Sequence, residues 1–326
     1  MLLSMRTPVL VLSDPGEPQL AMLNELRPNA DIAIGNSVHA FGNAVAEATV
    51  VFNWSGSLDL LRDVVGQCPN LRWVHSRSVG LERTLFRELI ESPVALTNGR
   101  GVFSSSLGEF ALAAILYFAK DLRRMIRNQV AGKWEPFDIV PISGQTVGII
   151  GYGDIGRAVA ARVRPMGMKV LAVKRHAPPS PGPDSPVDQF YTSERRLDML
   201  PRCDYVVVST PLTAETQAMI GEREFSAMKP NAVVINLGRG PVIEERALIQ
   251  ALANGRIKGA GLDVFDQEPL PIGHPFYKLE NVLLSPHCAD HTPDWLDQAM
   301  QFFIEQFKRF RDGQPLMHVV DKKLGY

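Results

Sequence analysis

The chain has 326 residues, of which 45% are hydrophobic and 21% are charged. This composition is typical of a globular protein, and the length allows one large domain or two ordinary ones. The formal net charge of −1 gives no general attraction to nucleic acid or to an anionic membrane, so we expect neither as a partner. Three widely separated cysteines, Cys68, Cys203 and Cys288, form no metal-binding or disulfide pattern and predict a reducing, cytoplasmic location.

The N-terminal segment is apolar but does not have the pattern of a signal peptide. Arg6 and Pro8 interrupt it and turn-forming residues 14–16 end it early, which favours a first β-strand. The longest apolar stretch, residues 107–119, contains Glu109 and is too short to span a bilayer.

The first hundred residues alternate short β-branched or apolar runs with stretches that suit helices, such as residues 19–26 and 58–67. An alternation of this kind predicts a parallel sheet covered by helices. The predicted strands are residues 8–13, 31–34, 49–54, 71–76 and 94–98.

Residues 102–127 predict one long helix that leads from this first part of the chain to the second. Leu107, Ala111, Ile115 and Phe118 recur at helical spacing, and apolar residues occur on nearly all sides. We therefore expect the helix to be buried, as a hinge between domains or a contact between subunits.

From residue 146 the alternation of strands and helices begins again. A proline-rich loop at 177–187 interrupts it, and an amphipathic helix at 296–310 follows the last strand. The predicted strands are residues 147–150, 170–173, 187–191, 205–209, 232–236, 259–264 and 282–285.

These elements predict an α/β protein with two doubly wound parallel-sheet domains, Rossmann-like or flavodoxin-like, and a cleft between them. Because the final helix can return to the first sheet, we expect a discontinuous substrate domain of residues 1–101 and 290–326. Residues 102–289 then form a dinucleotide-binding domain.

The stretch from residue 146 to 175 predicts how the dinucleotide is held. A strand-like run meets a turn with Gly151, Gly153 and Gly156, and a helix and a second strand follow. The first glycine permits the turn, the second lets a pyrophosphate approach the backbone, and the third lets helix and strand pack closely. The helix start offers free N–H groups to an anion. A glycine turn that serves packing alone is the less favoured alternative.

The residues after the second strand of this motif indicate which dinucleotide is bound. An acidic residue there would read the ribose 2′-hydroxyl of NAD, but this chain has Lys174 and Arg175. Both attract a 2′-phosphate, and Arg175 can hold it with two hydrogen bonds. We therefore expect NADP(H) to be preferred and NAD(H) to be possible. Two solvated charges at a strand end are the alternative.

Three polar side chains follow later strands and predict a hydride-transfer site. Arg239 lies between glycines after residues 232–236, Glu268 follows the next strand, and His287 follows the last. Because ligands of doubly wound sheets bind outside the carboxyl ends of the strands, these residues can converge near the nicotinamide. Each of them alone is more often a surface or structural residue.

Together the three suit reduction of a 2-oxo acid. Arg239 can hold the carboxylate and polarise the neighbouring carbonyl. His287 can give a proton to the forming alkoxide, and Glu268 beside it favours the protonated imidazole that this step needs.

Five segments, in this order and spacing, resemble the D-isomer-specific 2-hydroxyacid dehydrogenase family, which includes glyoxylate/hydroxypyruvate reductases and phosphoglycerate dehydrogenase. The segments are GYGDIG (151–156), STPLTAET (209–216), NLGRGPVI (236–243), GLDVFDQEPL (261–270) and SPH (285–287). The resemblance covers nearly the whole chain. It implies two Rossmann-like domains, the roles given above for Arg239, Glu268 and His287, and a homodimer formed through the cofactor domains.

The same resemblance implies further site residues. Backbone N–H groups of Ser78, Val79 and Gly80 should bind the substrate carboxylate, and Trp134 lies where some family members place a substrate-facing aromatic across the dimer. With Lys174 and Arg175, the predicted cofactor-binding residues are Gly151, Gly153, Asp154, Ile155, Gly156, Thr210, Pro211, Thr216, Leu237, Gly238, Arg239, Asp263, His287 and Ala289.

Other functions stay open on the same fold. Dinucleotide-sensing corepressors keep the same three catalytic side chains, but they have long flanking tails, and this chain ends soon after its last helix. Formate dehydrogenases share the fold but have a Gln-His pairing where this chain has Glu268 and His287, so formate dehydrogenase activity is less favoured.

Four further residues have open roles. Asp290 could tune His287 or, as we favour, cap the next helix, and no third ligand accompanies His287 and His291, so we expect no metal. Arg77 and Arg100 could favour a second acidic group on the substrate, although solvated surface charges are the favoured interpretation.

Overall fold

A computed structural model describes residues 6–326, and the chain divides into two compact units. Unit 1 is Met1–Val102 with Thr292–Tyr326, and unit 2 is Phe103–His291. The first five residues, where the apolar N-terminal segment begins, lie outside the described part. Assignment of the units as substrate and dinucleotide domains stays a prediction.

Unit 1 is built on a five-stranded parallel sheet of order β2-β1-β3-β4-β5. All five predicted strands are confirmed, with ends that shift by at most two residues. They are β1 (Thr7–Leu12), β2 (Ala30–Gly35), β3 (Val50–Asn53), β4 (Trp73–Ser76) and β5 (Ala95–Asn98).

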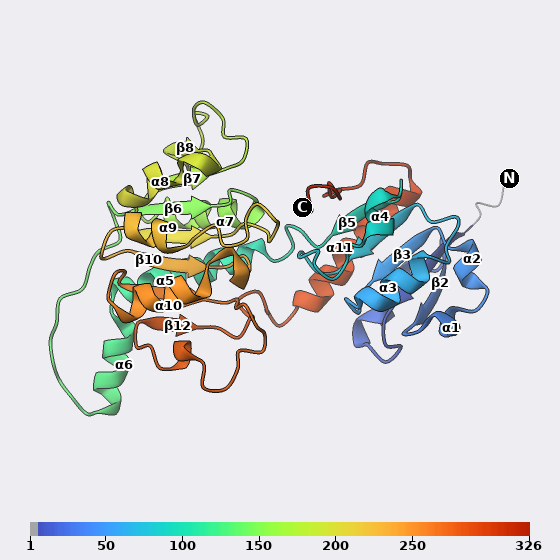
Figure 1. The fold of residues 1–326 in the computed structure, drawn as a ribbon. Coiled ribbons are helices and arrows are strands. Elements are labelled where there is room, and N and C mark those ends of the chain that lie inside the picture. Colours follow the sequence, from blue (N-terminus) through green and yellow to red (C-terminus); the bar gives the residue numbers. More distant parts are fainter. Residues whose placement is uncertain (1–5) are drawn as a thin grey trace. The chain divides into compact units, whose positions relative to one another are not determined.

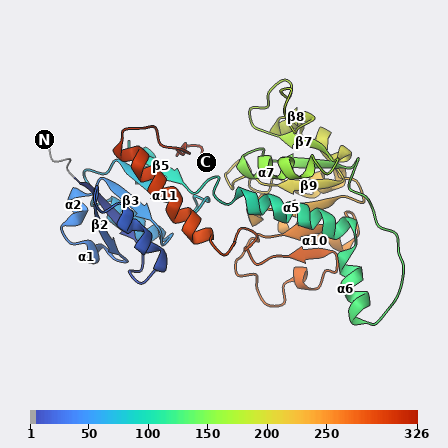
Figure 2. The same ribbon diagram turned by 180° about the vertical axis from the view of Figure 1, so that it is seen from behind.

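Helices cover both faces of this sheet. One face packs against α3 and α4 (Figure 1), and α11 crosses the other (Figure 2). In α11, Phe303 stacks on Phe52 of β3 with ring centroids 3.9 Å apart. The helices are α1 (Val38–Phe41), α2 (Ala44–Glu47), α3 (Leu58–Val65), α4 (Arg87–Glu91) and α11 (Trp295–Arg311).

The predicted helix at residues 19–26 differs in type from the expected one. It is a 3₁₀ helix, η1 (Pro18–Glu25). Leu20, Leu23 and Leu26 are buried, and their spacing of three matches the three-residue turn of a 3₁₀ helix better than an α-helix. The prediction of a helix here is confirmed, and the structure adds that it is a 3₁₀ helix.

Unit 2 has a seven-stranded parallel sheet of order β12-β11-β10-β9-β6-β7-β8. The chain builds outward from β6 in one direction and then continues from β9 in the other, which makes the boundary between β6 and β9 a topological switch point. All seven predicted strands are confirmed within two residues. They are β6 (Thr146–Ile150), β7 (Lys169–Val173), β8 (Gln189–Tyr191), β9 (Tyr205–Val208), β10 (Val233–Asn236), β11 (Gly259–Leu262) and β12 (Val282–Leu284).

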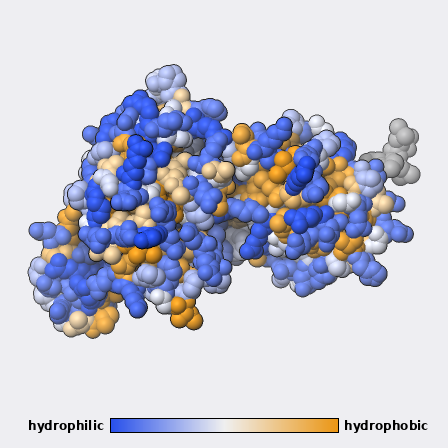
Figure 3. All heavy atoms as spheres, viewed as in Figure 1, coloured by the Kyte–Doolittle hydropathy of each residue, from blue (hydrophilic) through white to orange (hydrophobic). Residues whose placement is uncertain are grey.

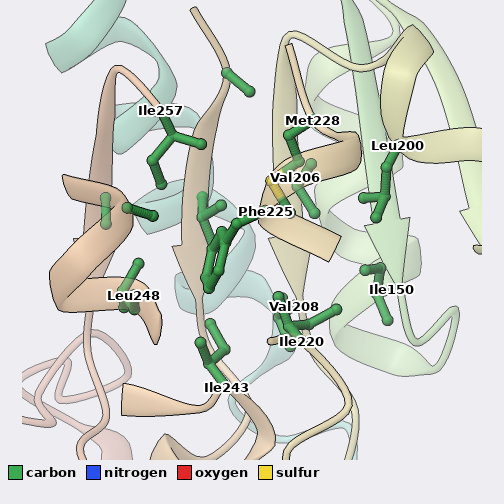
Figure 4. Packing of buried hydrophobic residues seen from close by; sticks show 14 of the residues in the cluster. Ile150, Leu200, Val206, Val208, Ile220, Phe225, Met228, Ile243, Leu248 and Ile257 are labelled. Carbon is green, nitrogen blue, oxygen red and sulfur yellow. The ribbon is translucent and has the colours of Figure 1, made fainter. Parts of the chain in front are cut away.

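Two apolar cores sandwich this second sheet. On one face α5 and α7 pack together (Figure 2), and on the other face the core includes Phe225, Leu248 and Val206 (Figure 4). The helices are α5 (Ser104–Ala119), α6 (Leu122–Val130), α7 (Asp154–Val163), α8 (Arg196–Met199), α9 (Glu222–Ala227) and α10 (Glu245–Ala253). Short 3₁₀ helices are η2 (Ser193–Arg195), η3 (Leu200–Arg202), η4 (Gly240–Val242) and η5 (Pro275–Tyr277).

The single long helix predicted at residues 102–127 is wrong. It is two helices, because Asp121 takes a left-handed conformation with φ of 49° and caps α6 by accepting a hydrogen bond from Arg124 N at 3.4 Å. Only α5 is buried as expected, whereas Ile126 and Val130 of α6 are 58% and 85% exposed. Within residues 6–326, none of the helices is long and apolar enough to cross a membrane.

A buried histidine in unit 1 makes the stability of that unit sensitive to acid. His75 on β4 lies fully buried among Phe52, Trp73 and Phe303, and its Nδ1 contacts Thr97 Oγ1 at 2.7 Å. Burial lowers the pKa of His75 to about 3. The folded protein therefore keeps this imidazole neutral at pH values where the unfolded chain protonates it.

We predict that unit 1 loses stability as the pH falls below about 6.5, the ordinary pKa of the unfolded histidine. The stabilisation is fully present above that pH and is lost progressively towards pH 3, with a loss of about 2 kcal/mol by pH 5. His75→Phe should flatten this dependence, and His39→Gln, a change at an exposed histidine, should not. Urea unfolding of both variants between pH 7.5 and 5 measures how the free energy of unfolding changes with pH. An equal change in the two variants would contradict the assignment of this pH dependence to His75.

Candidate active site

The turn between β6 and α7 has the geometry that a glycine-rich dinucleotide motif needs. Gly151 has a positive φ of 99°, and a Cβ there would lie 2.8 Å from Thr210 N. A Cβ on Gly156 would lie 2.4 Å from the carbonyl oxygen of Gly151, whereas a Cβ on Gly153 would meet nothing within 4 Å. Packing therefore requires two of the glycines, and the third leaves bare backbone open where the motif predicts a pyrophosphate.

Asp154 and Ile155 begin α7 directly after this turn. Asp154 forms an ion pair with Arg157, and the partly buried Ile155 packs against the core beneath α5 and α7. The acidic residue in the first turn suits the positive end of the helix dipole. Ser209 Oγ donates to the carbonyl of Gly151 at 2.8 Å and so ties the end of β9 to the turn.

Two basic residues follow the end of β7, as the sequence requires. Lys174 is exposed, whereas the Arg175 side chain is only 32% exposed and forms an ion pair with Glu215 from the loop after β9. Sequence reasoning missed Glu215, although the residue lies inside the segment 209–216 that carried part of the family resemblance. The predicted 2′-phosphate-binding side chain therefore already has a carboxylate as a partner.

The loop after β9 is held in a compact turn by Thr216. Its buried Oγ1 donates to the carbonyl of Pro211 at 2.6 Å and accepts from Thr213 N at 2.8 Å. Thr210 is in contact with the next loop, because a Cβ on Gly238 would lie 2.6 Å from the carbonyl oxygen of Thr210. Thr210, Pro211 and Thr216 are thus part of one rigid connection, and their contact with cofactor stays a prediction.

Asn236 positions the loop that carries Leu237, Gly238 and Arg239. Its Oδ1 accepts from Gly238 N at 3.1 Å, and its Nδ2 donates to the carbonyl of Arg239 at 3.0 Å. The half-buried Arg239 donates from Nη1 to the carbonyl of Gly238 at 2.7 Å. Sequence reasoning did not single out Asn236, although Asn at a strand end is a common turn-forming residue.

The two side chains of the predicted acid–base pair are in contact. His287 Nδ1 lies 2.6 Å from Glu268 Oε2, and the two side chains are 42% and 34% exposed. The other carboxylate oxygen of Glu268 accepts from Phe265 N at 2.9 Å, so both oxygens have partners. The Arg239 loop lies beside this segment, since a Cβ on Gly240 would lie only 2.0 Å from the carbonyl carbon of Phe265.

Asp263 fixes the loop on which His287 lies. This buried carboxylate uses Oδ1 to accept from Ser285 Oγ at 2.5 Å, Cys288 N at 3.0 Å and Ala289 N at 3.1 Å. Burial raises its pKa, and these hydrogen bonds oppose the rise. His287 itself has a positive φ of 52°, which the contacts on either side of it maintain.

The predicted substrate loop, Ser78 to Gly80, belongs to unit 1 and follows β4. Asn98 Nδ2 donates to the carbonyl of Val79 at 2.6 Å, which fixes the loop against the end of β5. Arg77, just before it, is not a freely solvated side chain. Its guanidinium carbon lies 4.8 Å from the ring centroid of Trp54 and 5.5 Å from that of Trp295, and burial lowers its pKa.

The interpretation of Asp290 as a helix cap is wrong. The N-cap residue of α11 is Asp294, and Asp290 instead lies 3.8 Å from His291, measured from Oδ1 to Nε2. Across residues 6–326, no cluster of three or more His, Cys, Asp or Glu side chains has the arrangement of a metal site. Trp134 is 97% exposed.

Similar proteins are known from sequence and from structure. A glyoxylate reductase of Korarchaeum cryptofilum (strain OPF8) is 32% identical over 282 residues, which is 80% of each chain. A D-isomer specific 2-hydroxyacid dehydrogenase of Xanthobacter autotrophicus Py2, solved with NADPH and MES, has a TM-score of 0.84 at 28% identity, covering 98% of this chain and 100% of that one. An NADPH-dependent glyoxylate/hydroxypyruvate reductase of Sinorhizobium meliloti, solved with NADP and sulfate, has a TM-score of 0.82 at 26% identity and the same coverage.

A family model gives the same answer as these individual proteins. The model of the NAD binding domain of D-isomer specific 2-hydroxyacid dehydrogenases matches residues 112–289, more than half of the chain. The match contains the glycine turn, the Arg239 loop, and the Glu268–His287 pair. This chain belongs to the D-isomer specific 2-hydroxyacid dehydrogenase family.

Proposed function

We propose that this protein is an NADP(H)-dependent oxidoreductase that reduces a small 2-oxo acid, of the glyoxylate or hydroxypyruvate type, to the D-2-hydroxy acid. The observation that carries the proposal is the 2.6 Å contact between His287 Nδ1 and Glu268 Oε2 beside the Arg239 loop. Membership of the family supports oxidoreductase chemistry at a CH–OH group with a nicotinamide dinucleotide. Relatives named as glyoxylate reductases support the size of the substrate.

In this proposal each side chain has one task. The dinucleotide, when bound, supplies the hydride, and the open backbone at Gly153 together with the start of α7 would hold its pyrophosphate. Arg239 would bind the substrate carboxylate and polarise the adjacent carbonyl. For unit 1, the family resemblance implies that backbone N–H groups of Ser78, Val79 and Gly80 bind a substrate carboxylate.

The Glu268–His287 contact supports the proton-transfer part of this proposal. A carboxylate at Nδ1 holds a proton on that nitrogen and fixes the orientation of the ring, which leaves Nε2 for the substrate. As hydride reaches the carbonyl carbon, Nε2 would give its proton to the carbonyl oxygen. Glu268 would keep the ring in this orientation during the transfer.

We predict that His287→Ala lowers kcat for 2-oxo acid reduction by about 10²- to 10⁴-fold, the usual contribution of a general acid. Binding of NADPH, measured by fluorescence, should change little. His274→Ala is a matched control, because His274 contacts Glu245 at 3.1 Å in the same kind of pair outside the site. Retained activity in His287→Ala would show that the proton comes from elsewhere.

A dinucleotide-sensing binding protein on the same fold is the second candidate. Corepressor-like proteins of this type keep the same three side chains, so the site alone does not separate the two functions. Oxidation of NADPH in the presence of a panel of small 2-oxo acids does separate them, because the binding protein would show no turnover with any of them.

We further propose that NADP(H) is preferred. The basic pair Lys174 and Arg175 at the end of β7 supports this preference, because neither residue would bind a ribose 2′-hydroxyl as a carboxylate does. Solved relatives with bound NADPH or NADP are consistent with it.

Arg175→Asp should raise the KM for NADPH by about tenfold or more, since a hydrogen bond to a charged group contributes about 1.5–3 kcal/mol. The KM for NADH should stay similar or fall. Arg223→Asp, the same change at an exposed position of α9, controls for the altered net charge. Steady-state kinetics with both cofactors give the answer, and equal use of NADPH and NADH by the unmodified protein would contradict the preference.

We propose a homodimer formed through unit 2. Ile126 and Val130 of α6 and Trp134 after it are 58%, 85% and 97% exposed, which is unusual for large apolar side chains on adjacent turns. Figure 3 shows apolar atoms among hydrophilic ones at the end of unit 2 where Figure 1 labels α6. A second copy that packs on this surface would cover them.

We also propose a reducing, cytoplasmic location for this protein. Its three cysteines are free thiols, which supports that location.

The double variant Val130→Glu/Trp134→Glu should be a monomer near 36.0 kDa in sedimentation velocity, where the unmodified protein should sediment at twice that mass. Buried carboxylates in an apolar interface are strongly destabilising unless they are paired. Ile272→Glu, at a fully exposed position outside α6, should leave the dimer intact. A monomeric unmodified protein would overturn this proposal.

A further inference from the structure

An ion pair joins the two loops on either side of the glycine turn. Arg175 lies two residues after β7, and Glu215 lies in the loop after β9. In the sheet, β7 and β9 are the two neighbours of β6, and the glycine turn follows β6. The pair therefore lies at the edge where the motif predicts a dinucleotide, and it involves the side chain that we propose for binding the 2′-phosphate.

The position of Glu215 is built into its loop. The neighbouring Thr216 is buried, and its Oγ1 bonds to Pro211 and Thr213 close the turn. A further backbone bond, from Gln217 N to the carbonyl of Thr213 at 2.9 Å, continues it. Although the Glu215 side chain is 70% exposed, the backbone that carries it has little freedom to move away from Arg175.

A carboxylate at this place opposes the binding of a 2′-phosphate in two ways. It accepts hydrogen bonds from the guanidinium that the phosphate would use, and it repels the roughly two negative charges of the phosphate at short range. Of the two exposed neighbours of Arg175, Lys174 carries a positive charge that attracts the phosphate, and His176 adds no negative charge. For NADH, which has a neutral 2′-hydroxyl, Glu215 causes no such repulsion and can accept a hydrogen bond from that hydroxyl.

We propose that Glu215 determines how strongly this protein discriminates NADP(H) from NAD(H), by competing with the 2′-phosphate for Arg175. The inference rests on the proposed role of Arg175 and extends it. Arg175 favours the phosphorylated cofactor, and Glu215 limits that preference and keeps NAD(H) usable. The end of β7 lacks the acidic residue of an NAD site, and the neighbouring loop provides a carboxylate from another direction.

The test compares Glu215→Gln with the unmodified protein. Removing the charge should lower the KM for NADPH by about two- to fivefold, the range expected for a partly exposed ion pair, and should leave the KM for NADH unchanged or slightly higher. The difference between the two proteins in the KM for NADPH should become smaller as salt is added, because salt screens the charge of Glu215. Glu222→Gln removes an exposed carboxylate of α9 and is the matched control for net charge.

A binding measurement makes the test independent of turnover. In calorimetry, Glu215→Gln should bind 2′,5′-ADP more tightly, and 5′-AMP equally well or slightly more weakly. In the Arg175→Ala background, Glu215→Gln should have a smaller effect on 2′,5′-ADP binding, because competition for the guanidinium is gone and only the direct repulsion of the phosphate is left.

The outcomes separate this inference from the proposed function. If the unmodified protein reduces no 2-oxo acid but the calorimetry behaves as stated, the proposed activity fails and the role of Glu215 stands. If Arg175→Ala abolishes the preference for 2′,5′-ADP but Glu215→Gln leaves it unchanged or weakens it, Glu215 only positions Arg175 and the inference is overturned. If Arg175→Ala leaves that preference intact, both the NADP(H) assignment and the inference fall.

Discussion

The candidate active site in unit 2 depends on one buried carboxylate. Asp263 follows β11, and a single oxygen of it accepts hydrogen bonds from Ser285, Cys288 and Ala289, which flank His287 after β12. Three donors on one anion oppose part of the cost of burying it, and they fix the loop in the conformation in which His287 has a positive φ. Without that constraint, the 2.6 Å contact with Glu268 would have no reason to persist at two half-exposed side chains.

The loops after β9, β10 and β11 are fixed by close backbone contact. A Cβ on Gly238 would meet the carbonyl of Thr210, and one on Gly240 would meet Phe265. Each glycine therefore lets one loop pack directly on the next, so that loops far apart in sequence form one surface. In a site of this kind the packed loops at the sheet edge hold the side chains in place. Substitution of either glycine by a larger residue would separate the loops.

The features that could be predicted from the sequence are those with a regular apolar pattern and those that directly follow a strand. All twelve strands were predicted because β-branched runs between turns are typical of strands. Arg239, Glu268 and His287 were singled out because each follows a strand, and the structure brings Glu268 and His287 into contact. The break at Asp121 was missed because apolar spacing continues across it, and only the left-handed residue shows the change. Arg77 looked like a surface charge, since the tryptophans that cover it are distant in sequence. Partners of this kind depend on tertiary packing and leave no local signal.

The two tasks proposed for unit 2 lie on different parts of one sheet edge. Arg175 and Glu215 belong to the loops after β7 and β9, whereas Glu268 and His287 belong to those after β11 and β12. In the strand order β12-β11-β10-β9-β6-β7-β8, β10 separates the two sets of strands. Side chains that share no partner and lie well apart contribute nearly additively, so a change at one pair has little effect on the other. Under the proposed roles, cofactor choice can therefore vary in this scaffold by exchange of a few charges after β7 and β9, while the proposed proton-transfer pair stays as it is beside the loop fixed by Asp263.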